Sequence, residues 1–116
     1  MNPRRASILA VLLALPAIAS AHHGWSGYDE TKPVTVTARL SDVAFENPHG
    51  SARVMRGEQQ WAVVLAPVAR MEARGLTKAM LTDGKPVTLV GYQRSDGTRE
   101  MRIERVTAQG KTVELR

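Results

Sequence analysis

The sequence contains no cysteine, and it has only three histidines and five aromatic residues among its 116 residues. Without cysteine the chain forms no disulfide and offers no thiolate nucleophile. No glycine-rich phosphate loop opens a helix, and no Ser-His-Asp set has supporting context. The segment Gly24-Trp25-Ser26-Gly27 lacks the spacing of a nucleophile elbow. Asp42 and Glu46 lie near one turn, but nothing in the sequence separates their pKa values for acid and base roles. The sequence therefore predicts a protein that is not an enzyme.

The only long apolar run is too short to cross a membrane. Residues 6–15 are apolar apart from Ser7, whereas a membrane-spanning helix needs about 20 apolar residues. Arg4 and Arg5 precede the run, and Pro16 ends it. This order of a basic start, an apolar stretch and a break is typical of a secretory signal peptide. We therefore predict export to the periplasm, with no transmembrane segment after cleavage.

Small residues after the apolar run allow two cleavage registers. Ala19-Ser20-Ala21 fits the small-x-small rule for cleavage before His22, and Ala17-Ile18-Ala19 permits cleavage before Ser20. We predict a signal peptide over residues 1–21. The mature N-terminus is then His22 or, in the alternative register, Ser20.

The mature chain, residues 22–116, is long enough for one domain with one core. The full chain has 16 basic and 11 acidic residues; since Arg4 and Arg5 leave with the signal peptide, 14 basic residues and a net charge of +3 remain. This balance favours anionic partners. The interleaved charges of Glu100, Arg102, Glu104 and Arg105 are instead typical of a strand that faces solvent. Nucleic acid is a poor candidate partner, because export separates the protein from it and few aromatic residues are present to stack on bases.

Alternating apolar residues predict a mainly β domain. The alternation from Val34 to Leu40 changes phase at Val43 and Phe45, which predicts a long strand with a bulge near Ser41-Asp42. Further strands are expected over Ala52 to Met55, Trp61 to Leu65, Val87 to Leu89, Met101 to Ile103 and Val113 to Leu115. We expect Trp61 to be the principal core residue.

A short helical connection is expected between the third and fourth of these strands. Pro67 suits the first turn of a helix, Gly75 offers a stop, and Thr77 can cap a second short turn. This order predicts a small five- to six-stranded OB-like barrel, with a β-sandwich as the alternative.

The first mature residues, 22–33, contain two glycines and two aromatic residues without periodicity. They predict an extended N-terminal arm, with Trp25 and Tyr28 packed onto the body.

All three histidines fall at or near places where no regular strand is expected. Imidazole is the commonest protein ligand for borderline metals. Cleavage before His22 gives an amine and an imidazole on one residue, whereas cleavage before Ser20 gives an amine, two amides and an imidazole, a set that Cu(II) favours. We predict a copper site formed by His22, His23 and His49. The alternatives are a terminal stub with incidental histidines and a His49 that bonds the backbone of its own turn.

Five segments of the chain resemble those of one protein family: Ala21-His22-His23-Gly24-Trp25, Phe45-Glu46-Asn47-Pro48-His49, Leu76-Thr77, Met80-Leu81 and Gly84-Lys85-Pro86-Val87-Thr88. The family comprises small exported bacterial proteins catalogued as domain of unknown function 6152. Many members have tryptophan and threonine in place of Phe45 and Glu46, and serine in place of Gly24. The resemblance implies export and a barrel-like fold, and it places the three histidines in recurring motifs. It implies no established activity.

Two functions are consistent with these features. The first is a non-enzymatic periplasmic binding protein that holds Cu(II) through its mature N-terminal histidines. The alternative is a periplasmic barrel that binds a partner protein or an anionic ligand through its basic face, without a metal.

Overall fold

The computed structural model describes residues 24–116, so the predicted signal peptide, His22 and His23 lie outside the described residues. The described chain is mainly β, as predicted. Its elements follow in the order β1 (Val34–Ala38), β2 (Ser41–Ala44), β3 (Ser51–Arg56), β4 (Gln59–Val64), α1 (Val68–Ala73), α2 (Lys78–Thr82), β5 (Val87–Gln93), β6 (Glu100–Ala108) and β7 (Lys111–Glu114).

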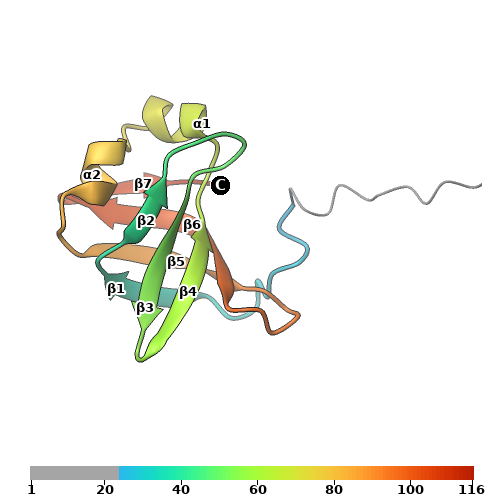
Figure 1. The fold of residues 1–116 in the computed structure, drawn as a ribbon. Helices are drawn as coiled ribbons and strands as arrows, with labels where there is room; N and C mark the ends of the chain where they lie inside the picture. Colours follow the sequence, from blue (N-terminus) through green and yellow to red (C-terminus); the bar gives the residue numbers. More distant parts are fainter. Residues whose placement is uncertain (1–23) are drawn as a thin grey trace, which may run out of the picture.

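The strands form one sheet that curls into a half-barrel (Figure 1). Its order is β1-β5-β6-β4-β3-β2, and β7 pairs with β6 beside this path. All neighbours are antiparallel except β4 and β6, which run parallel. The two ends of the path, β1 and β2, are consecutive in the chain and are separated only by Arg39 and Leu40. Because one bent segment supplies both end strands, the sheet must curve.

The phase change in the first apolar stretch corresponds to an irregularity in β2. The pairing of β2 with β3 shifts register between Ser41 and Ala44, and Asp42 has a φ of 48°. The bulge predicted near Ser41-Asp42 is therefore present. The stretch forms two strands rather than one, since β1 pairs with β5 whereas β2 pairs with β3.

Two short helices lie between β4 and β5, and Figure 1 shows them together at one end of the curled sheet. Pro67 is the N-cap of α1. The Thr77 hydroxyl accepts a hydrogen bond from the Met80 backbone N–H at 3.4 Å and so caps α2. Met71 and Leu81, one on each helix, are buried against the inner face of the sheet.

The core fills the inside of the curl, with residues such as Leu65, Leu89, Met101 and Ile103 completely buried or nearly so. Trp61 is not among them, so its predicted role as the principal core residue is wrong. It is half-buried at the margin of the core, and the guanidinium carbon of Arg56 lies 4.4 Å from its ring centroid. Trp61 lies near the start of β4, so Val63 later in that strand and Leu65 just after its end supply the deeper contacts.

Candidate functional site

Four neighbouring strands place one row of side chains on the outer face of the sheet. Ser51 on β3 is paired with Val64 on β4, Val64 with Arg102 on β6, and Arg102 with Tyr92 on β5. Paired residues project to the same side of a sheet. Met101, next to Arg102 in the chain, points the other way into the core. We call this row the outer row.

The N-terminal arm covers the β5 and β6 half of the outer row. The Trp25 ring packs edge-on against Tyr92, with 6.0 Å between centroids. Farther along the arm, the Tyr28 hydroxyl donates a hydrogen bond to Glu100 Oε2 at 2.7 Å. The Asp29 backbone N–H donates to the Gln93 carbonyl at 2.8 Å. The prediction that Trp25 and Tyr28 pack onto the body is confirmed.

Arg102 lies beneath the arm and is only 6% exposed. The prediction that it faces solvent, drawn from the alternating charges of this strand, is wrong because the arm covers this part of the outer face. Its Nη1 donates a hydrogen bond to the Gly24 carbonyl at 2.9 Å, and its guanidinium carbon lies 4.7 Å from the Trp25 centroid. The Arg116 guanidinium carbon lies 4.5 Å from the same ring.

The environment of Arg102 is electrostatically unfavourable. Burial lowers the pKa of the guanidinium below its usual range, and the positive charges of Arg70 and Arg116 lower it further. Arg102 forms no ion pair with any carboxylate of residues 24–116, and its buried Nε has no hydrogen-bond partner there. Arginine nevertheless stays charged in proteins. A contact with an aromatic face contributes only about 0.5–2 kcal/mol, which is less than the several kcal/mol that burying an ion costs.

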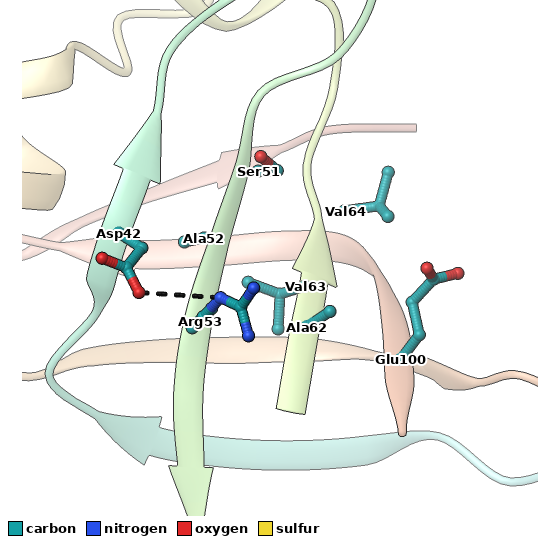
Figure 2. A pocket seen from close by; sticks show the side chains of 8 residues that line it. All are labelled: Asp42, Ser51, Ala52, Arg53, Ala62, Val63, Val64 and Glu100. Carbon is teal, nitrogen blue, oxygen red and sulfur yellow. Dashed lines mark ion pairs between the residues drawn. The ribbon is translucent and has the colours of Figure 1, made fainter. Parts of the chain in front are cut away.

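The other half of the outer face, over β3 and β4, is open and hollowed (Figure 2). The hollow has a volume of about 440 Å³, within the range of small-ligand sites. Figure 2 shows Asp42 and Arg53 paired on one side and Glu100 on the opposite side; the pair is 3.6 Å apart and both side chains are largely exposed. The hollow is lined by Asp42, Ser51, Ala52, Arg53, Ala62, Val63, Val64 and Glu100. Two members of the outer row, Ser51 and Val64, thus border it.

The three predicted copper ligands fall in different parts of the structure. His22 and His23 lie outside the described residues, immediately before Gly24. His49 is half-buried in the connection between β2 and β3, two residues before Ser51. Within residues 24–116 the side chains of His, Cys, Asp and Glu form no group of three that could hold a metal ion.

The His49 turn is attached to the outer row through the backbone. Gly50 N–H donates to the Ala66 carbonyl at 2.9 Å, and Leu65 N–H donates to the Gly50 carbonyl at 2.8 Å. These bonds extend the pairing of β3 and β4 beyond Ser51 and Val64. His49 therefore lies just before the uncovered end of the outer row, which is Ser51. Gly24 is held at Arg102, in the same row.

Sequence reasoning missed Arg102, although a signal was present. Arg102 lies between Met101 and Ile103, both of which face inward. The alternation along the strand therefore assigns Arg102 to the outer face, which is expected to be exposed to solvent. The two aromatic residues of the arm indicate that the arm covers part of the domain surface. Only the register of Tyr92 with Arg102 shows which charged residue this is.

No helix of residues 24–116 has the length and apolar character needed to cross a membrane. A search of curated proteins found no match. The sequence profile of the Family of unknown function (DUF6152) matches residues 10–102, which is most of the chain and includes both the histidine-bearing start and the His49 turn. The chain therefore belongs to this family.

Proposed function

We propose that this is an exported, non-enzymatic binding protein that holds one Cu(II) ion at its mature N-terminus. The ligands are the nitrogens of His22 and His23, with His49 closing the coordination shell. The protein acts after removal of residues 1–21, in the periplasm.

The observation that carries this proposal is that the arm start and the His49 turn meet the same row of the outer face. Gly24 is fixed by Arg102, and His49 precedes Ser51 by two residues. Arg102 and Ser51 are two strands apart, or roughly 10 Å at about 4.8 Å per strand. Two extended residues before Gly24 span up to about 7 Å. The proposal therefore requires His22 or His23 to reach His49 across the strand that carries Val64.

The fold proposed for this function is a barrel of the OB type. The parallel pairing of β4 with β6, the two helices between β4 and β5, and the bent segment that supplies both β1 and β2 support this assignment. In such a barrel the ends of the sheet are joined by the segment at Arg39 and Leu40 rather than left as free edges.

Copper binding at these nitrogens competes with protons. An imidazole has an ordinary pKa of about 6.5 and an α-amine one of about 7.7 to 8.0, and both must be deprotonated to coordinate. Affinity for Cu(II) is therefore expected to fall steadily as the pH is lowered from about 8 to about 5.

The test begins with the intact mass of the protein recovered from the periplasm, which is expected to start at His22 or Ser20. Isothermal titration of this species with Cu(II) at neutral pH should show one bound ion. One residue added before His22 should disrupt a chelate of its own amine and imidazole. His49→Ala should weaken binding if His49 closes the shell.

The matched control is a variant in which His22, His23 and His49 are all alanine. If the processed protein binds Cu(II) no better than this variant, the metal proposal fails, and binding of a partner or anion through the basic face becomes the leading function. Recovery of an uncleaved, membrane-bound 116-residue chain would contradict the export proposal itself.

A further inference from the structure

The Arg102 guanidinium is a buried cation with unused hydrogen-bonding capacity. Arginine carries five N–H donors in a rigid fork. One of them reaches the Gly24 carbonyl, while the buried Nε has no partner within residues 24–116. A neutral carbonyl is a weaker acceptor than an anionic oxygen, and a single acceptor does not use the fork.

Of the two cations that act on Arg102, only Arg116 has carboxylate partners in the described part of the chain. Arg116 forms ion pairs with Glu30 and, at 3.7 Å, with Glu104. Arg70 donates to the Leu115 carbonyl at 3.0 Å and brings no negative charge to the site. Within residues 24–116, no carboxylate therefore pairs with the Arg102 charge.

We propose that Arg102 binds a small oxyanion, a carboxylate or a phosphate, whose oxygens take the Nε and Nη donors in place of the Gly24 carbonyl. Both kinds of anion present paired oxygens that match the guanidinium fork. The anion binds when the start of the arm lifts from the outer face.

The arm is built so that its start can lift while the rest stays attached. Tyr28 and Asp29 are held by hydrogen bonds to Glu100 and Gln93. The Gly27 carbonyl accepts a hydrogen bond from the Ser95 N–H at 2.9 Å, and the Trp25 carbonyl accepts one from the Tyr28 N–H at 3.0 Å, so the attached part of the arm extends to the Trp25 backbone. Only the Gly24 carbonyl and the Trp25 ring must move to expose the fork.

The open hollow gives room for the remainder of a larger ligand. Val64 lies beside Arg102 in the outer row and lines the hollow. A ligand whose oxyanion binds Arg102 can therefore extend over Val64 and Ala62, which offer apolar contacts. The Asp42 and Glu100 carboxylates bordering the hollow disfavour a second negative charge there.

The test uses Trp61→Phe protein, in which Trp25 is the only tryptophan. Acetate and inorganic phosphate are titrated separately at constant ionic strength, with chloride as the balancing anion. Either oxyanion should change the Trp25 emission with saturation, and the two titrations show which class is preferred. Arg102→Lys keeps the charge but loses the fork, so it should weaken binding by about tenfold or more. The matched control Arg99→Met removes an exposed arginine of the same hairpin and should leave binding unchanged.

A second measurement requires no substitution in the site. The ¹⁵N resonance of the Arg102 Nε–H should shift on addition of the preferred oxyanion, while those of exposed arginines should not. Absence of saturable binding by both anions, or equal losses in Arg102→Lys and Arg99→Met, would overturn the proposal. The site uses only residues 24–116, so a failed copper titration leaves it standing, and a failed anion titration leaves the copper proposal standing.

Discussion

Arg102 on β6 donates a hydrogen bond from Nη1 to the carbonyl oxygen of Gly24, 78 residues earlier in the chain. This contact and the Trp25 ring beside it connect the start of the arm to the centre of the outer face. The arm is therefore part of the folded structure from Gly24 onward.

Replacing Trp25 should loosen the arm and destabilise the protein. Trp25→Ala removes an aromatic contact with Tyr92 and the contacts with Arg102 and Arg116. Because the ring is half-buried, we expect a loss of about 2 kcal/mol rather than the 3–5 of a full core position. Urea denaturation measures this loss. Ser26→Ala, at an exposed position next to it, is the control and should change the midpoint very little; an equal midpoint in both variants would show that the arm contributes nothing to stability.

The position of Trp61 leads to a comparison with Leu65 on the same side of the chain. Trp61 is half-buried, whereas Leu65 is 1% exposed. Leu65→Ala should therefore cost about 2–5 kcal/mol by leaving a cavity, and Trp61→Ala should cost about 1–2 kcal/mol. Chemical denaturation of the two variants under identical conditions gives the order. A larger loss for Trp61→Ala would mean that its ring is buried more deeply than the structure shows.

The strands were predictable from sequence to the extent that one side of each was apolar. Val63 and Met101 follow the alternation and are buried, and the phase change before Val43 correctly indicated the irregularity at Asp42. The pattern could not show how far along a strand the core extends. Trp61 fits the alternation, but it packs at the margin of the core, where the Arg56 guanidinium also lies over its ring.

The candidate site was less predictable because it depends on pairing between distant segments. The histidines stand out from composition alone, and their places in the chain were read directly. The burial of Arg102 depends on β5, β6 and the arm together, since Tyr92 supplies the neighbouring position and Trp25 the cover. A strand pattern assigns a residue to a face, but it cannot tell whether another segment covers that face.

Gly91 is required where β5 passes close to β6. A Cβ at this position would lie 2.2 Å from the Arg102 carbonyl oxygen, and backbone atoms cannot easily give way. Gly91→Ala should cost at least 1–3 kcal/mol, about the range for overpacking, by forcing the two strands apart. Gly50→Ala is the matched control, because its Cβ would meet the flexible end of Met71 at 2.6 Å. Thermal unfolding should show a clearly larger decrease in Tm for Gly91→Ala; equal decreases would contradict the close strand approach.

The Tyr28 hydroxyl should make the protein sensitive to alkali. Burial and the hydrogen bond to Glu100 raise the pKa of Tyr28 from 10.0 to about 12. Because the folded pKa exceeds the unfolded one, this group stabilises the fold fully below pH 10, and its contribution disappears as the pH rises from about 10 through about 12. Two pKa units correspond to at most about 2.7 kcal/mol, which partial exposure of the ring reduces to about 1–2 kcal/mol.

Tyr28→Phe isolates this contribution, because it keeps the ring and removes the ionisable hydroxyl. The pKa of Tyr92 is also raised, through its hydrogen bond to Glu104. Tyr92 and the lysines are present in both proteins, so their effects on stability cancel in the difference. Urea midpoints at about pH 9 and about pH 11.5 should therefore converge: the native protein is more stable at the lower pH, and its advantage over Tyr28→Phe shrinks at the higher one. A constant difference between the two proteins across this range would show that the Tyr28 hydroxyl has the same pKa in the folded and unfolded chains, and that its hydrogen bond to Glu100 does not hold the arm in solution.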